Sequence, residues 1–180
     1  SHSIYVVKIE SKLTKRNPSP PFMTATLQQE ASRKLGLGTK QTMSVAQKLY
    51  EAGLITYMRT DGIDMDLDAI KESRSEIQKK YGKQYVPEKP RFYKNKARNA
   101  QEAHECIRPT NLAKLSKDLN DSDNIQKKLY ELIWKRTISS QMASADIEET
   151  KIDLGPEKDQ FLLRATGAET VFDGFKRVYL

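Results

Sequence analysis

The chain is organised around one stretch, Gly53-Leu54-Ile55-Thr56-Tyr57-Met58-Arg59-Thr60-Asp61. Leu54 and Ile55 predict the buried start of a short extended segment, after which polar residues fall on both faces. Residues i and i+2 of an extended chain point to the same side, so we expect Tyr57 and Arg59 to project together. A phenol beside a permanent cation suits phosphate oxygens. A strand end that carries a surface tyrosine and a surface arginine fits the same pattern.

The composition favours a polyanionic partner and excludes several classes of protein. The 180 residues carry a net charge of +7, which favours nucleic acid, although a basic balance can also serve solubility alone. No apolar run reaches about 18 residues, the length of a membrane span, and no secretory signal is visible. The single Cys106 cannot form an internal disulfide, and one cysteine with two histidines cannot complete a structural zinc site. We expect a soluble protein of a reducing compartment.

Cations and aromatic rings alternate between Lys79 and Arg98. The cations are Lys79, Lys80, Lys83, Lys89, Arg91, Lys94, Lys96 and Arg98. The rings are Tyr81, Tyr85, Phe92 and Tyr93. Cations can displace counterions from phosphates, and rings can stack on unpaired bases at about 1–3 kcal/mol each. A solvated loop whose rings tuck beneath it explains the same pattern.

Two short helices are predicted before the organising stretch. The β-branched and aromatic residues of 4–10 predict a strand, and the prolines of residues 12–21 indicate a connector. From Thr24 an apolar residue recurs every fourth position until the glycines of residues 36–38 end the helix. Thr39 then caps a second helix, which stops at Gly53. The two helices and the extended segment predict a helix-turn-helix with a β wing, although ordinary helical hairpins share this pattern.

The rest of the chain predicts further helices and then strands. Asp64 or Asp66 caps a helix that runs to Tyr81, a short helix lies within residues 110–119, and a long one spans 121–142. After residue 145 the apolar period drops to two, and turn signals at 155–156 and 166–167 separate strands within 147–154, 161–165 and 171–179. The expected class is mixed α+β. A helical domain of residues 18–144 is inserted into a β domain made of residues 1–17 and 145–180.

A second candidate for the site lies within residues 100–110. If this segment is helical, Gln101, His104 and Glu105 share a face. His104 among carboxylates could carry a proton, or contact phosphate when charged. It could equally be a satisfied structural histidine. Cys106 is expected to be packed rather than reactive.

Three stretches, taken in order, resemble the type IA DNA topoisomerases. The central one is Leu54 to Asp61, whose Met58 is typical of the bacterial branch of the family. The upstream stretch is Pro21-Phe22-Met23-Thr24-Ala25-Thr26-Leu27-Gln28-Gln29. The downstream stretch is Ala100-Gln101-Glu102-Ala103-His104-Glu105-Cys106-Ile107-Arg108-Pro109-Thr110. Three matches in the family's order are much more specific than any one of them, and the resemblance extends from about Ile4 to Leu180.

The resemblance implies a function and a set of site residues. Tyr57 would attack a DNA phosphodiester and form a 5'-phosphotyrosine bond, which the reverse reaction reseals without ATP, so that negative supercoils are relaxed. Arg59 would stabilise the charge on the phosphate, and His104 would hold the backbone or assist proton movement. The DNA-binding residues would be Thr56, Arg108, Lys94, Lys96 and Arg98. The helical domain would project from a β gate, and the protein would act on single-stranded DNA segments in the bacterial cytoplasm, at the nucleoid.

The same resemblance implies a missing part. Family members carry a TOPRIM domain whose acidic cluster binds Mg²⁺, and nothing before Ile4 supplies it, so we expect the isolated chain to bind single-stranded DNA without relaxing supercoils. Two alternatives stay open. One is a non-catalytic winged-helix DNA-binding module, and the other is a helical module whose basic loop binds acidic protein partners.

Overall fold

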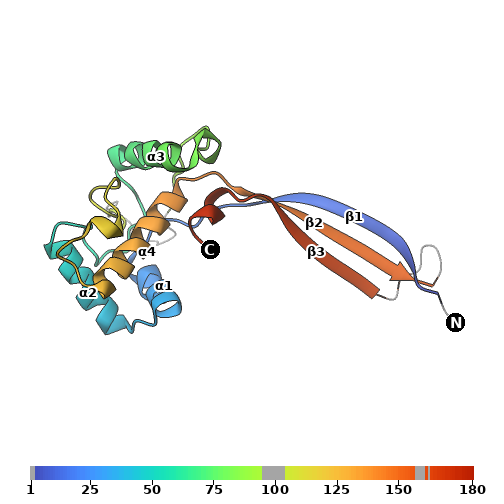
Figure 1. The fold of residues 1–180 in the computed structure, drawn as a ribbon, viewed down its shortest axis with the longest axis horizontal. Helices are drawn as coiled ribbons and strands as arrows, with labels where there is room; N and C mark the ends of the chain where they lie inside the picture. The colour runs from blue at the N-terminus through green and yellow to red at the C-terminus, as the bar shows by residue number, and fades with distance from the viewer. Residues whose placement is uncertain (1–2, 95–103, 157–160, 162) are drawn as a thin grey trace.

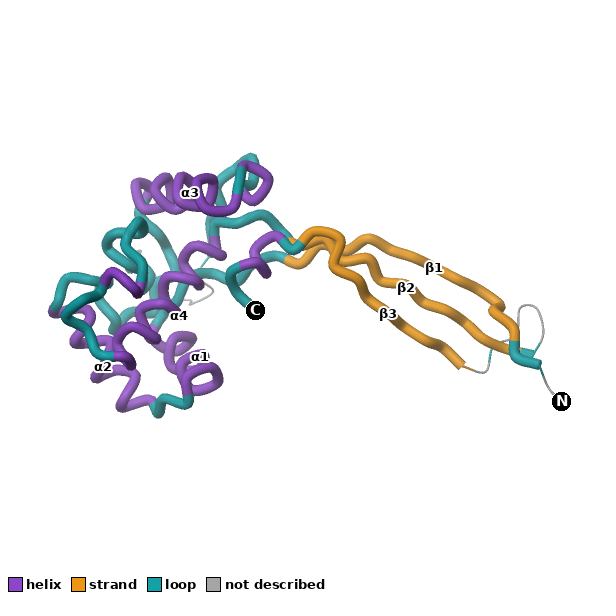
Figure 2. The backbone as a smooth tube through the Cα atoms, viewed as in Figure 1, coloured by secondary structure: helices purple, strands orange, loops and turns teal. Residues whose placement is uncertain are grey.

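A computed structural model describes residues 3–94, 104–156, 161 and 163–180, and it confirms the mixed α+β class. A body of four α-helices lies at one end, and a three-stranded antiparallel sheet extends away from it (Figures 1 and 2). The elements in chain order are β1 (Tyr5–Arg16), α1 (Thr24–Leu35), α2 (Thr39–Glu51), α3 (Leu67–Tyr81), η1 (Lys83–Tyr85), η2 (Ser116–Asp118), α4 (Asn124–Ser140), β2 (Ala145–Gly155), β3 (Leu163–Phe172) and η3 (Gly174–Arg177). Within the described residues, no helix has both the length and the apolarity that a membrane crossing requires.

Helix α4 forms the centre of the helical body and packs against α1, α2 and α3. Its inner face buries Leu129, Ile133 and Ile138 completely. Polar atoms on the same helix are satisfied internally, since the Trp134 indole donates to the carbonyl of Leu112 at 2.8 Å. Burial of apolar side chains at this spacing explains why a sequence of modest hydrophobicity folds around one helix.

The helix ends follow the predicted capping chemistry, with one exception. Asp66 is the N-cap of α3, and its carboxylate accepts from the backbone of Asp68 at 2.8 Å and of Ala69 at 3.4 Å. Helix α1 ends at Gly36, as predicted. The predicted cap of α2 is wrong by one residue, because Gly38 is the N-cap and Thr39 is already helical.

The sheet has the order β1-β2-β3, so β2 pairs with a strand on each side. Most side chains of β1 and β3 are exposed, and β2 buries the carboxylate of Asp153. Arg164 of β3 donates to that carboxylate at 2.6 and 2.9 Å, and this holds the pKa of Asp153 below its usual range. Ladder hydrogen bonds and cross-strand pairs therefore hold the sheet together where its faces lack a core.

Three predicted strand limits are wrong. The first strand runs to Arg16 rather than Glu10, because β2 is long enough to pair with it as far as Ala145. The predicted turn at residues 166–167 lies inside β3, where Gly167 pairs with Thr150. The expected strand over residues 171–179 stops at Phe172 and is followed by η3, which returns the chain to the helical body. In the first two cases tertiary pairing overrides local turn composition.

Gly174 allows this return. It has φ of +50°, and a Cβ atom there would lie 2.3 Å from the carbonyl oxygen of Ser144. The segment after it places Phe175, Val178 and Tyr179 against the helical core. A side chain at Gly174 would separate the sheet from the body at their junction.

We predict that Gly174→Ala lowers the free energy of unfolding by about 2 kcal/mol or more, because it combines a left-handed backbone with a backbone clash. Urea denaturation followed by circular dichroism measures the change. Gly167→Ala is the matched control, since Gly167 has open space around it and no positive φ. Equal midpoints for the two variants would contradict the assigned role of Gly174.

Candidate active site

The organising stretch is held in place by pairing with residues 104–110. Ile55 forms an isolated antiparallel bridge with Pro109. The Thr56 hydroxyl donates to the carbonyl of Cys106 at 2.7 Å and accepts from the amide of Arg108 at 2.9 Å. The backbone amide of Thr56 donates to the Arg108 carbonyl at 2.9 Å. Two segments that lie about fifty residues apart in the chain are thus joined through one threonine.

Exposed and buried side chains alternate over residues 57–59, whereas Ile55 is buried although it lies two residues before the exposed Tyr57. Ile55 and Met58 are buried at 1% and 0% exposure, whereas Tyr57 is 50% exposed and Arg59 is exposed. Met58 therefore anchors the backbone between the two functional candidates. Tyr57 and Arg59 lie on the wall of one pocket, so that one ligand can reach both, and their projection as an extended i, i+2 pair stays a prediction.

The N-terminus of α1 is bonded to the backbone on both sides of Arg59. The Thr24 hydroxyl donates to the carbonyls of Met58 at 2.7 Å and Thr60 at 3.0 Å, and it accepts from the Thr60 amide at 2.8 Å. The Thr24 amide also donates to the Thr60 carbonyl at 2.9 Å. The first turn of α1 and the Arg59 backbone consequently move as one unit.

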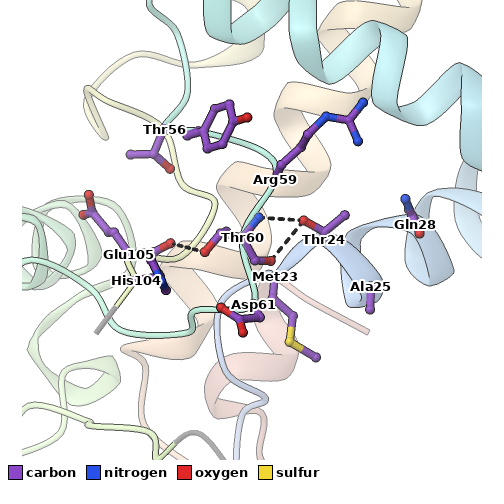
Figure 3. Close-up of a pocket in the computed structure, with 11 residues that line it drawn as sticks. Met23, Thr24, Ala25, Gln28, Thr56, Arg59, Thr60, Asp61, His104 and Glu105 are labelled. Atoms are coloured by element: carbon purple, nitrogen blue, oxygen red, sulfur yellow. Dashed lines mark hydrogen bonds between the residues drawn. The ribbon is translucent and has the colours of Figure 1, made fainter. Parts of the chain in front are cut away.

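These segments enclose an open pocket of about 830 Å³ (Figure 3). The lining residues are Met23, Thr24, Ala25, Gln28, Thr56, Tyr57, Arg59, Thr60, Asp61, His104 and Glu105. All three predicted catalytic residues, Tyr57, Arg59 and His104, are among them. Their catalytic roles stay predictions, but the structure places them around one cavity.

The three side chains occupy different parts of the wall. The Tyr57 ring stands edge-on to Tyr50, with ring centroids 5.3 Å apart and an angle of 64° between the planes. The Arg59 side chain extends away from His104 and Glu105 (Figure 3). Within the described part of the chain, no carboxylate forms an ion pair with Arg59, which leaves its charge for a ligand.

His104 is positioned by its backbone. A Cβ atom at Gly62 would lie 1.7 Å from the carbonyl oxygen of His104, so the backbones of these two residues are in direct contact. The Thr60 hydroxyl donates to the carbonyl of Glu105 at 3.1 Å (Figure 3). The expectation of a helix does not hold for residues 104–110, because they form single bridges with three other segments, while Gln101 lies outside the described residues.

The predicted DNA-binding residues separate into three groups. Thr56 lines the pocket, but its hydroxyl already donates a hydrogen bond to the carbonyl of Cys106. Arg108 does not line it, since its guanidinium donates to the Glu105 carboxylate at 2.6 Å and to the carbonyl of Pro109 at 3.0 Å. Lys94 is exposed and away from the pocket, and Lys96 and Arg98 lie outside the described residues.

The aromatic residues of the basic stretch are mostly packed. Tyr85 is buried and its hydroxyl donates to Asp173 at 2.7 Å. The Tyr93 hydroxyl donates to the Ser140 carbonyl at 2.7 Å, and burial raises the pKa of Tyr93 to about 12. Phe92 is 70% exposed. The structure thus favours rings tucked beneath the loop, with Phe92 as the exception.

The sequence reasoning missed several pocket residues. They are Met23, Thr24, Ala25, Gln28, Thr60, Asp61 and Glu105. All of them belong to the three stretches that carry the resemblance, which was the signal available. Thr24, Thr60 and Glu105 are joined by long-range hydrogen bonds that no local spacing reveals.

The described residues of the pocket do not gather as metal ligands. Among the residues that the structure describes, no three histidine, cysteine or carboxylate side chains converge as metal ligands. The carboxylate of Glu105 is bonded to Arg108 and receives the Asp66 amide at 3.4 Å. The residues present therefore do not fit a magnesium ion, and the N-terminal turn of α1 is instead suited to an anion.

Removal of the Thr24 hydroxyl should loosen the site. We predict that Thr24→Val lowers the free energy of unfolding by about 1–3 kcal/mol, because it leaves buried backbone groups of the Arg59 segment unsatisfied. Thr24→Ser keeps the hydroxyl and should lose less than half as much. Urea denaturation of the two variants provides the comparison, and an unchanged stability in Thr24→Val would refute the role of this hydroxyl.

A methyl group at Gly62 should displace His104. We predict that Gly62→Ala shifts the NMR signals of the His104 ring and of the amides of residues 104–106, because the backbone must move away from the new Cβ atom. Gly38→Ala serves as the control, since a Cβ atom at Gly38 meets no atom within 4 Å. Unchanged His104 signals in Gly62→Ala would show that this contact does not position the histidine.

Comparisons with known proteins agree with one another across the whole chain. A family model described as DNA topoisomerase matches residues 1–180. The chain is 50% identical over 188 aligned residues to DNA topoisomerase 1 of Rickettsia bellii, covering 99% of this chain and 24% of that protein. It is 54% identical over 174 residues to DNA topoisomerase 1 of Zymomonas mobilis, covering 97% of this chain and 14% of that protein.

A solved structure shares the fold. Full-length topoisomerase I from Thermotoga maritima superposes with a TM-score of 0.84 at 36% sequence identity, covering 98% of this chain and 29% of that one. The chain therefore spans less than a third of the length of these relatives. The match nevertheless includes both the helical body and the sheet, and this chain belongs to the DNA topoisomerase family.

Proposed function

We propose that the chain is the tyrosine-bearing segment of a type IA DNA topoisomerase, which cleaves and reseals one DNA strand to relax negative supercoils. The observation that carries the proposal is the shared pocket. Tyr57, Arg59 and His104 line it together with the first turn of α1. A nucleophile, a cation and an anion-binding helix end are the groups that phosphoryl transfer requires.

In the proposed reaction, the Tyr57 hydroxyl oxygen attacks the phosphorus of a DNA phosphodiester. A phosphotyrosine bond forms to the 5' side of the break, and the bond to the 3' oxygen breaks. The phenolic proton leaves Tyr57, and the released 3' oxygen gains one. Attack by that 3' hydroxyl on the phosphotyrosine reverses each change. The energy of the broken bond is kept in the new ester, so that resealing consumes no ATP.

Arg59 and the start of α1 would stabilise the charge on the phosphate. Arg59 has no carboxylate partner among the described residues, and its backbone is fixed on both sides by Thr24. Met23, Thr24 and Ala25 bring the positive end of the helix dipole to the same pocket. Preorganised donors stabilise developing charge without further rearrangement, which is the largest effect available to such a site.

His104 would carry a proton or contact the phosphate. It is exposed on the pocket wall, so that a ligand can reach its ring. A histidine can change its charge near neutral pH, which suits either role. Thr56 and Arg108 support this part of the site by holding residues 105–108, and Lys94, Lys96 and Arg98 stay proposed as contacts to a single DNA strand.

The remaining parts of the activity lie outside this chain. Since the pocket carboxylates do not form a metal site, magnesium would be bound by residues of a TOPRIM domain elsewhere in the polypeptide, and no step proposed here depends on it. We propose that the chain alone binds single-stranded DNA without relaxing supercoils. Residues 18–144 would be the tyrosine domain, and residues 1–17 and 145–180 part of a β gate in a protein of the bacterial cytoplasm.

Covalent capture tests the nucleophile. In the complete polypeptide, a single-stranded oligonucleotide labelled at its 3' end should remain attached to protein after denaturation, whereas a 5' label should be released. Tyr57→Phe should abolish the adduct, because the attacking oxygen is gone. Tyr50→Phe is the matched control, since its ring packs against Tyr57 and lies 40% exposed.

The outcomes separate the alternatives. An adduct that persists in Tyr57→Phe would refute the assignment of the nucleophile. Tight DNA binding with no adduct in the parent protein would favour a non-catalytic DNA-binding module. Loss of the adduct in Tyr50→Phe as well would indicate a packing effect rather than a chemical one.

A further inference from the structure

A second hollow of about 650 Å³ lies on another face of α1, at the junction of the helical body and the sheet. Helix α1 lines the candidate active site with Thr24, Ala25 and Gln28, and the second hollow with another set of residues. That set is Thr26, Gln29, Glu30 and Arg33. The two sets do not overlap, so the hollows are separate surfaces of one helix.

Arg136 is one of the residues that line this second hollow. Its side chain is only 9% exposed, and its Nε donates to the carbonyl of Pro20 at 2.7 Å. The guanidinium lies 4.8 Å from the ring centre of Phe22 and 5.0 Å from that of Tyr179. Across the described ranges no carboxylate pairs with it, and a buried cation without a counter-charge attracts an anion.

The hollow is strongly basic. Its cations are Arg16, Arg33, Arg136 and Lys176. Its one acidic side chain, Glu30, accepts hydrogen bonds from Arg33 at 2.9 and 3.0 Å and from the Tyr179 hydroxyl, and the bond from Arg33 holds the pKa of Glu30 below its usual range. Arg16 pairs only loosely with Glu149, at 3.7 Å, and Lys176 has no ion pair among the described residues. Arg136 and Lys176 therefore carry positive charge that no carboxylate side chain pairs with among the described residues.

A neighbouring hollow of about 380 Å³ continues the positive surface. It shares Lys176, Tyr179 and Leu180 with the hollow of about 650 Å³. It adds four cations, which are Lys34, Lys128, Lys135 and Arg177. Its one acid, Glu131, is paired with Lys135 at 2.7 Å. We call the two hollows together the junction groove.

We propose that the junction groove binds the phosphate backbone of a nucleic-acid strand at a site separate from the Tyr57 pocket. Cations spread over two adjoining hollows fit a row of phosphates better than one free ion, and the planar Arg136 fork suits phosphate oxygens. The membership in the DNA topoisomerase family favours nucleic acid over an acidic peptide. The proposal does not depend on the cleavage chemistry, because it concerns binding alone.

Fluorescence anisotropy on the 180-residue chain tests the groove, with a labelled oligothymidine of about 12 nucleotides titrated at several salt concentrations. The double variant Lys128→Gln/Lys176→Gln should weaken binding about tenfold and should lower the salt slope by about 1.4, the value for two lost single-strand phosphate contacts. Lys40→Gln/Lys117→Gln removes the same charge from lysines that line neither hollow. That control should keep the parent affinity within about twofold.

A second measurement reports on Arg136 without altering a buried residue. Its Nε–H NMR signal should shift on addition of the oligothymidine, and the shift should be absent in the groove variant. If both double variants lost the same affinity for oligothymidine, the loss would be explained by net charge alone, and the proposed site would be wrong. Inorganic phosphate is added at a concentration equal to the total phosphate of the oligothymidine. If it produced the full Arg136 shift, the groove would bind a free phosphate ion rather than a nucleic-acid strand. An unchanged oligothymidine affinity in the groove variant would also overturn the proposed site.

Discussion

The Thr24 hydroxyl is the contact on which the candidate site depends. It makes three hydrogen bonds of 2.7 to 3.0 Å to Met58 and Thr60, the neighbours of Arg59 in the chain. A short extended segment has no regular ladder of its own, so its backbone groups need partners from elsewhere in the fold. Helix α1 supplies them, and it thereby brings its own positive end beside Tyr57 and Arg59.

A second threonine completes the frame. Thr56 joins the same segment to residues 106–108, and Met58 fills the core between the two attachments. The exposed side chains of Tyr57 and Arg59 are consequently carried by a segment whose backbone is hydrogen-bonded at Thr56, Met58 and Thr60. This division suits a site that must hold a nucleophile at a fixed position while it leaves room for a large substrate.

The sheet and the helical body are stabilised by different means. The body has one apolar core around α4, whereas the sheet is held by its ladder and by pairs such as Asp153 with Arg164. The two parts meet where Tyr85, Phe172 and η3 return to the core. A long exposed sheet attached at one end is a shape suited to a larger assembly, in agreement with relatives of which this chain spans only a part (Figure 1).

The sequence by itself determined the mixed class and the four α-helices of the described residues, because these follow from local periodicity. The tertiary structure alone decided which polar side chains remain available to a ligand. Thr56 has the chemistry of a DNA contact, but its hydroxyl is occupied by the carbonyl of Cys106, which only folding brings beside it. Thr24 carries no local signal of its role, since its partners lie over thirty residues away.

Long-range pairing also set the features that local composition predicted wrongly. Gly167 suggests a turn, yet it lies within β3 because β2 offers a continuous partner strand. The junction groove is formed by residues from both ends and the middle of the chain, such as Arg16, Arg136 and Lys176. Periodicity records which face of an element is buried, whereas hydrogen-bond partners and charge clusters depend on which elements meet, and packing decides that.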